Sequence, residues 1–399
     1  MEDSTIADAT GVWGSAPVVF DVGALWRRLA ALIDRRHEQG KRYGLPLVLL
    51  LVVLAKLSGE DRPSGIADWV EHRRVQLVKA LGLDLVRTPH HNTYRRILAD
   101  AILPGELDRE IGAFFGELPL VGISTLVSID GKTIKGTMDA EDPRGEHLLV
   151  AYLPSEGIVL LQVAAGNKDN EISVAPTLVR GLDLRGKVVA ADAMHTQREF
   201  SAQILQAGGE YLFLVKDNQP SLRDEIELLF SGDDRTVEGG RVAHDFKTAR
   251  RMNKGHGRRE VREITVSGEL KGYSDWPGLE QVFRLDRERI DLGTGEIKRE
   301  THYGLTSLTP SEASPARLLE LTRQYWGVEN GLHYRRDVTF REDETRLTKG
   351  KAGHVMASIN NLVIGLLRIA GFTNLAAARR YCDADLTNAL ALLASTTRQ

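Results

Sequence analysis

The chain has 399 residues, of which 42% are hydrophobic and 27% are charged, as expected for a globular protein with two or three domains. Its single cysteine, Cys382, excludes an internal disulfide framework and a zinc site built from several thiolates, and this fits a reducing compartment. The net charge of −3 excludes a uniformly basic nucleic-acid-binding protein, so any DNA-binding surface must be local.

The sequence predicts neither an export signal nor a membrane segment. The acidic start, Met1 to Ser4, lacks the charged and then apolar layout of a signal peptide. The longest apolar stretch, from Leu45 to Ala55, contains Pro46 and is shorter than the roughly 20 residues that cross a bilayer. We therefore expect a protein of the cytoplasm with no membrane partner.

The first part of the chain predicts a loose leader followed by a helical domain. Residues 1–20 carry Gly, Ser, Ala and Pro without periodicity. In residues 21–119, apolar side chains recur at helical spacing, as at Leu25, Leu29 and Leu32. The expected helices lie near residues 25–32, 46–57, 66–70, 93–98 and 103–115.

From residue 120 to 238 the pattern changes to short strands that alternate with helices. This layout is typical of a mixed α/β domain. The expected strands are 125–129, 148–153, 158–164, 187–191 and 211–215, and the expected helices are 175–182, 198–207 and 221–230.

Residues 239–310 predict a β-rich insertion, and residues 311–380 predict a return to helices. Alternating stretches at 261–266, 282–287 and 297–303 indicate antiparallel strands. Ser314 and Pro315 are a good N-cap and first helical residue, and 355–369 is strongly apolar. Residues 381–399 form a C-terminal tail.

Three carboxylates stand out as candidate ligands of divalent metal ions. Asp130 and Asp192 each follow an apolar run and precede a small residue, and Glu329 lies in a later helical pattern. An isolated Asp at a strand end is more often a cap, but active sites of open α/β sheets gather at the carboxyl ends of strands. Paired hard cations held by carboxylates can drive in-line attack on a phosphodiester.

Spacing on an ideal helix places His333 and Arg336 on the same face as Glu329. A basic side chain beside the third acid would suit a DNA phosphate. Asp337 and the acids from Glu342 to Glu344 compete with Glu329 for the role of third acid.

In several sequence blocks the chain resembles the DDE transposases of bacterial insertion sequences, in the ISAs-type branch that includes the H-repeat-associated proteins. The helical segment before Asp130, with 34–36 (DRR) and 66–69 (IADW), resembles the N-terminal associated domain of that branch. The other matching blocks are 130–136 (DGKTIKG), 167–172 (NKDNEI), 192–197 (DAMHTQ), 211–219 (YLFLVKDNQ), 256–260 (HGRRE) and 326–333 (WGVENGLH).

The resemblance implies an α/β RNase H-like catalytic core with a β-rich insertion, preceded by an all-α domain. It implies that Asp130, Asp192 and Glu329 form the DDE triad and hold two Mg²⁺ ions, for which Mn²⁺ can substitute. The expected activity is cleavage at transposon ends and transfer of a 3′-OH into target DNA. The expected partners are double-stranded DNA and a second copy in a homodimer, in the bacterial cytoplasm at the nucleoid.

The helix around Glu329 departs from the broader group. Thr322 stands at the usual Tyr position, Tyr325 at the Arg position and Arg336 at the Lys position, and Arg323 is a candidate replacement for the missing cation.

Other basic and polar residues are candidate DNA contacts. Arg258 and Arg259 lie in a basic stretch of the insertion, where a solvated loop is the alternative; their joint replacement by Ala is expected to weaken binding and flatten its salt dependence. Lys216, Asn218 and Gln219 follow a strand and either contact the transposon end or form a polar turn. His195 and Gln197 are expected to support Asp192 by hydrogen bonding.

Two other functions remain open on the sequence. One is a domesticated DNA-binding protein without catalysis, and the other is an RNase H-like nuclease that cuts DNA without joining it. Strand cleavage with Mg²⁺ or Mn²⁺ separates the first of these from a transposase, and joint products separate the second.

Overall fold

The computed structural model describes residues 22–118, 125–166, 171–231, 236–237, 240–241, 245–255 and 257–393, so the predicted leader 1–20 lies outside the described residues. The chain divides into two compact units. The first comprises residues 1–123, 131–168 and 329–399, and the second comprises residues 124–130 and 169–328. The chain passes from the second unit to the first inside strand β1 (Leu126–Ile134) and again at Glu329.

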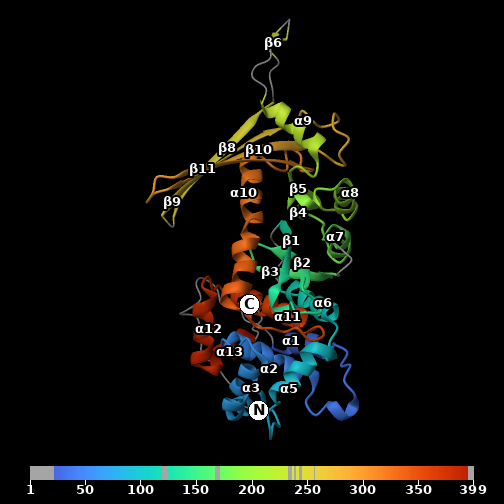
Figure 1. The fold of residues 1–399 in the computed structure, drawn as a ribbon, viewed down its shortest axis with the longest axis vertical. Coiled ribbons are helices and arrows are strands. Elements are labelled where there is room, and N and C mark those ends of the chain that lie inside the picture. The colour runs from blue at the N-terminus through green and yellow to red at the C-terminus, as the bar shows by residue number, and fades with distance from the viewer. Residues whose placement is uncertain are drawn as a thin grey trace, which may run out of the picture. The chain divides into compact units, whose positions relative to one another are not determined.

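Helices build most of the first unit, and the helices expected before residue 119 are present (Figure 1). One helix was not expected: α4 buries only Leu77, and its apolar residues do not form a clear helical stripe. The elements are α1 (Val22–Ala30), α2 (Leu45–Leu57), α3 (Pro63–His72), α4 (Arg74–Leu81), α5 (His91–Arg96), α6 (Pro104–Gly116), the hairpin β2 (Glu146–Leu153) and β3 (Ile158–Ala165), α11 (Ala352–Ile369), α12 (Leu375–Ala384) and α13 (Leu386–Leu393).

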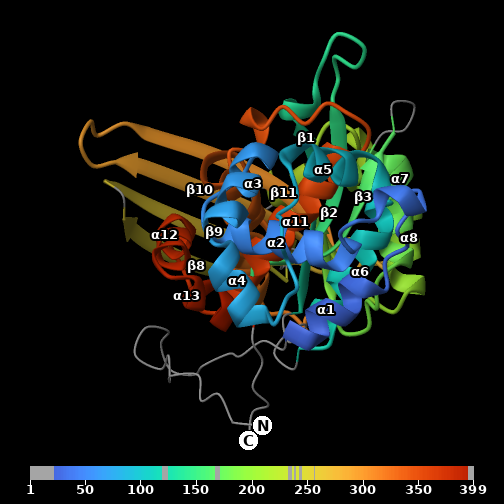
Figure 2. The same cartoon turned by 90° about the horizontal axis from the view of Figure 1, so that it is seen from below.

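Two apolar helices form the core of the first unit. Nearly every side chain of α2 is buried, as expected for a helix that is hydrophobic all round. Helix α11 has the length and apolarity of a membrane-crossing helix, but it is buried along most of its length, as a core helix is. It packs against α6 and the hairpin of β2 and β3 (Figure 2). The predicted C-terminal tail, residues 381–399, includes the end of α12 and all of α13, so its described part is mainly helical.

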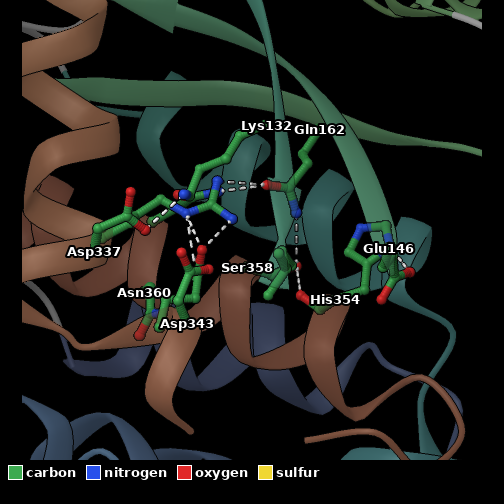
Figure 3. Close-up of polar contacts among 12 residues, drawn as sticks. Lys132, Glu146, Gln162, Asp337, Asp343, His354, Ser358 and Asn360 are labelled. Carbon is green, nitrogen blue, oxygen red and sulfur yellow. Dashed lines mark hydrogen bonds and ion pairs between the residues drawn. The ribbon is translucent and has the colours of Figure 1, made fainter. Parts of the chain in front are cut away.

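A buried charged cluster ties α11 to two other elements of this core. The His354 side chain is 4% exposed; its Nε2 lies 2.8 Å from Asp108 Oδ2 on α6, and its Nδ1 lies 3.2 Å from Glu146 Oε1 on β2 (Figure 3). Burial alone would lower the pKa of His354, but the hydrogen bonds and charges of Asp108 and Glu146 outweigh it and raise the pKa to about 9. The imidazolium therefore contributes to the stability of the fold.

This cluster predicts that the protein loses stability between about pH 6.5 and pH 9. Below pH 6.5, His354 is protonated in both the folded and unfolded states, so its contribution is complete; it is lost as the pH rises through the folded pKa of about 9. The difference from the ordinary value of 6.5 corresponds to about 3 kcal/mol. Urea unfolding at pH 6 and pH 9.5 measures it. The variant His354→Gln should lack this pH dependence, and equal slopes for variant and wild type would contradict the assignment.

The second unit is built on a sheet that is parallel at one end and antiparallel at the other. Strand β1 up to Ile129 pairs in parallel with β4, and β4 pairs in parallel with β5. The β-rich insertion is present as antiparallel strands, and β11 pairs with β5, so the insertion continues the same sheet. Strand β8 was not expected because its residues are mainly charged or polar. The order after β1 is β4 (Val188–Ala191), β5 (Glu210–Val215), β11 (Ile297–Thr306), β10 (Gln281–Asp291), β9 (Arg258–Ser267) and β8 (Lys247–Gly255).

Helices cover both faces of this sheet within the second unit (Figure 1). On one face α10 (Pro315–Tyr325) packs in a core with Val188, Ala190, Leu212 and Leu214. The intervening side chains face the opposite way, where Phe213 stacks on Phe200 of α8. Strand residues buried on both faces explain why these strands read as continuous apolar runs. The other helices of this unit are α7 (Glu171–Arg180), α8 (Arg198–Gln206) and α9 (Pro220–Ser231), and a separate two-stranded sheet contains β6 (Thr236–Val237) and β7 (Gly240–Arg241).

Candidate active site

The second unit places Asp130 and Asp192 side by side. The parallel register pairs Ile129 of β1 with Ala191 of β4, so the next residues on the two strands are the two acids. Residues 188 and 190 face α10, and the alternation of side chains along a strand directs Asp192 to that same face. The sequence suggested that Asp130 lies at the end of its strand. Strand β1 continues to Ile134, so Asp130 lies within the strand, and only the parallel pairing with β4 ends before it.

The Asp192 carboxyl is partly buried, and nearby charged groups shift its pKa. Burial raises the pKa of the Asp192 carboxyl; the negative charges of Glu171 and Asp130 raise it further, and His195 opposes them. Its Oδ1 accepts hydrogen bonds from the backbone N–H groups of Met194 (3.1 Å) and His195 (3.4 Å), so Asp192 also caps the short helix Ala193–His195. The site concentrates negative charge that a cation would relieve.

Two further residues belong to this site, and neither was assigned from the sequence. Tyr325, at the end of α10, is 8% exposed; burial raises its pKa, and the charges of Asp130, Asp192 and Glu171 raise it further. Glu171, in the first turn of α7, accepts or shares a hydrogen bond with His195, whose Nε2 lies 3.1 Å from Glu171 Oε2. The only sequence signal for Glu171 was its position in the block 167–172, whose residues 167–170 lie outside the described chain.

The loop after β5 braces the loop after Asp192. Asn218 Nδ2 donates to the backbone oxygen of Ala193 (2.6 Å), and Gln219 Nε2 donates to that of Thr196 (2.9 Å). Gln197 takes part in the same contacts through its side-chain oxygen, which accepts from Gln219 (3.3 Å). The sequence left DNA contact and a polar turn open for Asn218 and Gln219; in the structure their amides hold the Asp192 loop, while Lys216 is exposed.

Glu329 opens a segment of the first unit whose helical geometry is unusual. Residues Glu329–His333 and Arg335–Thr339 are π-helical, so their turns are wider than those of the α-helix assumed from the sequence. Glu329 is exposed, and a ring nitrogen of His333 lies within 4.8 Å of its carboxylate oxygen. His333 itself is only 5% exposed, which argues against the DNA contact predicted for it and leaves it as a neighbour of Glu329.

Arg336 is fully buried, so the prediction that it contacts a DNA phosphate is wrong. Its Nε lies 3.0 and 2.9 Å from the two carboxylate oxygens of Glu342, and its Nη2 lies 2.8 Å from Glu342 Oε2. Asn360 Nδ2 also donates to Glu342 (2.9 Å), and Gln162 Oε1 lies 3.5 Å from Arg336 Nη1. The wider π turns carry this residue off the face of Glu329 and into the core of the first unit. Figure 3 shows Gln162 and Asn360 around this core.

Three of the four acids that competed with Glu329 already have partners within the first unit. Asp337 Oδ1 lies 2.6 Å from Lys132 Nζ (Figure 3). Glu342 is buried against Arg336, and Asp343 Oδ1 accepts a hydrogen bond from the backbone N–H of Lys135 (3.0 Å). Each of them has a structural role, and this favours Glu329 as the third acid.

Arginines line up across the antiparallel strands on the α10 face. The register places Arg251 of β8 opposite Arg262 of β9, and Arg262 opposite Arg287 of β10; we call these three residues the arginine row. Residue Ile264, two positions from Arg262, packs in the α10 core, so the row faces the same way as Asp192. Burial holds the pKa of Arg262 below its usual range against the pull of Glu260, and Arg287, Arg323 and Arg251 lower it further.

Such crowding of like charges is unfavourable in a sheet unless anions offset it. Glu260 offsets part of it, because it forms ion pairs with both Arg262 and Arg287. The Arg287 guanidinium also lies 5.5 Å from the ring centroid of Trp326, just beyond α10. Arg323, predicted as a DNA contact, is exposed in the last turn of α10 and joins this cationic surface.

Arg258 and Arg259 are both exposed at the start of β9, but they face opposite sides of the sheet. Arg258 shares the face of Arg262, because residues four apart on a strand point the same way. Arg259 points to the face opposite α10 and lies across from Lys254. The two adjacent arginines therefore form a matched pair for testing which face meets DNA.

Comparison with known families identifies relatives for nearly the whole chain. Residues 122–366 match the family described as the transposase DDE domain, and residues 26–115 match the DDE_Tnp_1-associated family. Two relatives from Escherichia coli are 28% identical. The "H repeat-associated putative transposase YhhI" of strain K12 aligns over 86% of this chain and 90% of its own length, and the "Putative transposase YncI" of strain O157:H7 over 85% and 86%.

A solved structure of a piggyBac transposase synaptic complex with hairpin DNA is also similar. It is 10% identical with a TM-score of 0.41, and the alignment covers 94% of this chain and 83% of that one.

Proposed function

The chain belongs to the transposase DDE family and is a DNA transposase, and we propose that it cleaves DNA at the ends of its mobile element and joins the freed 3′-OH to target DNA. The observation that carries this proposal is the pair of acids, Asp130 and Asp192, on neighbouring parallel strands and on one face of the sheet. Their placement at the end of the parallel pairing supports an RNase H-like core.

The transposase DDE domain implies the use of divalent metal ions, and the residues present fit such ions. Asp130 and Asp192 offer carboxylate oxygens, which Mg²⁺ and Mn²⁺ prefer. Burial raises the pKa of Asp192, and the charges of Glu171 and Asp130 raise it further, so a cation would stabilise its ionised form. We propose that Asp130, Asp192 and Glu329 hold two Mg²⁺ ions. Such ions, when bound, supply an activated water or 3′-OH and stabilise the leaving oxygen.

Other residues of the second unit would prepare this chemistry. His195 and Glu171 fix the loop that carries Asp192, while Asn218 and Gln219 hold the same loop from the other side. Tyr325 keeps its proton, because burial and the nearby carboxylates raise its pKa, so its hydroxyl can donate a hydrogen bond to a substrate oxygen.

We propose that the arginine row, Arg323 and Lys216 contact the DNA backbone. The row shares a face with the acids, and its positive charge, which Glu260 and Glu300 offset only in part, favours a polyanion. Trp326 beside Arg287 adds an aromatic surface on which a base can stack.

The matched pair Arg258 and Arg259 tests which face meets DNA. We expect Arg258→Ala to weaken binding to every duplex and to reduce the slope of log K against log salt by about 1, because this side chain faces the same way as the acids. Arg259→Ala should leave the slope unchanged. Fluorescence anisotropy over a salt series measures both, and equal effects of the two variants would rule out an interface confined to the α10 face.

Strand cleavage tests the proposed function directly. The substrate is a duplex that carries the DNA flanking the gene, incubated with the full chain and Mg²⁺, Mn²⁺ or Ca²⁺. We expect nicked ends and joint products with Mg²⁺ and Mn²⁺. Binding without cleavage in any metal would favour a domesticated DNA-binding protein, and cleavage without joint products would favour a nuclease.

We further propose that two copies act together on DNA in the bacterial cytoplasm, because joining an element to a target requires both of its ends. Mass photometry of the chain with and without duplex DNA tests this, and a single copy on paired ends would contradict it.

A further inference from the structure

A basic hollow lies in the first unit, and none of the proposed metal ligands is among its lining residues. It has a volume of about 400 Å³ and is enclosed by the start of α3, by α5 and by the segment that precedes α11. Four of its lining side chains are cations and three carry hydroxyl groups, and none of the described lining residues is an acid or an aromatic residue. The cations are Arg62, Arg95, Arg346 and Lys349, and the hydroxyl groups are those of Ser64, Thr345 and Thr348.

These cations are not neutralised by the protein. Arg95, Arg346 and Lys349 are exposed, and none of the three forms an ion pair within 4 Å among the described residues. Within the described ranges, the one hydrogen bond that Arg62 donates is long (3.4 Å) and goes to the backbone oxygen of Glu344. A second hollow shares Arg62, Arg95 and Arg346 and adds Asp343 and Glu344, of which Asp343 already accepts a hydrogen bond from Lys135. The surface is therefore cationic overall.

The backbone that carries these cations is fixed in place. Buried Glu342, held by Arg336, anchors the start of the segment, and Thr345 Oγ1 donates to the backbone oxygen of Glu342 (2.7 Å). At its other end, Lys351 N donates to the backbone oxygen of Ala99 (3.0 Å). Gly350 approaches so closely that an added Cβ would lie 2.6 Å from Ala99 O. The segment that precedes α11 is thus held against the residues that follow α5. The site is therefore preformed in the structure without a ligand.

We propose that this hollow binds a phosphate group of the DNA backbone. Guanidinium and ammonium groups with nearby hydroxyls are the donors that phosphate prefers, and the lack of aromatic lining favours phosphate over base stacking. Arg62 and Arg95 would contact the same DNA strand as residues 345–349, which lie far from them in the sequence. The inference rests on the proposed function, since it takes the polyanion to be duplex DNA.

Anisotropy with a fluorescein-labelled duplex, in EDTA so that no cleavage occurs, tests the proposal on the full chain. The test variant is Arg95→Ala with Arg346→Ala. We expect its affinity to fall at least roughly tenfold for every duplex, since each lost charged hydrogen bond costs about 1.5 kcal/mol or more. The slope of log K against log salt should fall by about 2. The single charge reversal Lys349→Glu should weaken binding in the same direction.

The matched control is Arg87→Ala with Arg109→Ala, which removes two exposed arginines of the same unit outside the hollow. Equal effects of the test and control variants, or an unchanged salt slope, would overturn the proposal. Because the four cations are exposed or at the rim, melting temperatures of all variants should match the wild type. Cleavage by the wild-type chain with Mg²⁺ is read separately, so a failed proposal for the hollow and a failed proposal for the activity give different results.

Discussion

Replacing Asp192 by Asn will reduce DNA cleavage by roughly a thousand-fold or more, and Asp130→Asn will do the same. Metal ions at such sites supply several kcal/mol of charge stabilisation, and each 1.36 kcal/mol is a factor of ten in rate. Asn keeps the shape of Asp and can still accept the backbone hydrogen bonds from Met194 and His195. Only the charge is removed. Single-turnover cleavage of a labelled end duplex measures the loss.

The folded state should tolerate this change. Because burial raises the pKa of Asp192, its negative charge is less favourable in the folded chain without metal than in the unfolded chain, and Asn removes that cost. We therefore expect Asp192→Asn to match or exceed the wild-type melting temperature in EDTA. Mg²⁺ should raise the melting temperature of the wild type and not of the variant, since a ligand that binds only the folded state stabilises it.

The control is Asp183→Asn, an exposed carboxylate of the same unit that pairs with Arg185 (2.7 Å). It should leave cleavage and the response to Mg²⁺ unchanged. Cleavage by Asp192→Asn at the rate of this control would end the assignment of the site.

The third acid can be separated from its rivals by the same assay. We expect Glu329→Gln to lose cleavage as the two Asp variants do, because its carboxylate is exposed and is not part of a buried ion pair. Asp337→Asn removes the ion pair with Lys132 and should reduce stability without a comparable loss of cleavage. A greater loss for Asp337→Asn would move the role of third acid to that residue.

The apolar pattern of the sequence was sufficient to predict most helices and strands and to predict that Asp130 and Asp192 lie together. Strands buried on both faces read as continuous apolar runs, and parallel strands bring their ends to one edge, so Asp130 and Asp192 could be placed together from the sequence. The positions around Glu329 could not, because the prediction assumed 3.6 residues per turn. Two π-helical stretches follow, and they turn Arg336 into the core.

Residues that act through contacts distant in sequence gave no local signal. His354 meets Asp108 and Glu146 from elements more than 200 residues away, so nothing near it predicts a raised pKa. The arginine row depends on the register of three strands, one of which, β8, was too charged to be predicted as a strand. Glu171 reaches His195 only after α7 and the Asp192 loop have packed.

Arg336→Ala is expected to be the most destabilising single substitution, at about 3–5 kcal/mol. Among the described residues, it would leave Glu342, which is 2% exposed, as a buried carboxylate with one remaining hydrogen bond, from Asn360 (2.9 Å). It would also remove the contact between Arg336 Nη1 and Gln162 Oε1. That oxygen would keep the hydrogen bond that Asn361 donates to it (3.0 Å). Urea unfolding at pH 7 measures the loss, which should appear as a lower midpoint with the slope unchanged.

The double variant Arg336→Met with Glu342→Leu separates the lost ion pair from the lost packing. Replacing both partners of a buried pair by apolar groups of similar size is often neutral or stabilising, because neither charge is left without a partner. We therefore expect the double variant to recover most of the stability that Arg336→Ala loses. If it is as unstable as the single variant, the packing of Arg336 matters more than its charge. Because Glu342 anchors the segment that carries Arg346 and Lys349, the double variant should bind DNA more weakly than its stability alone suggests.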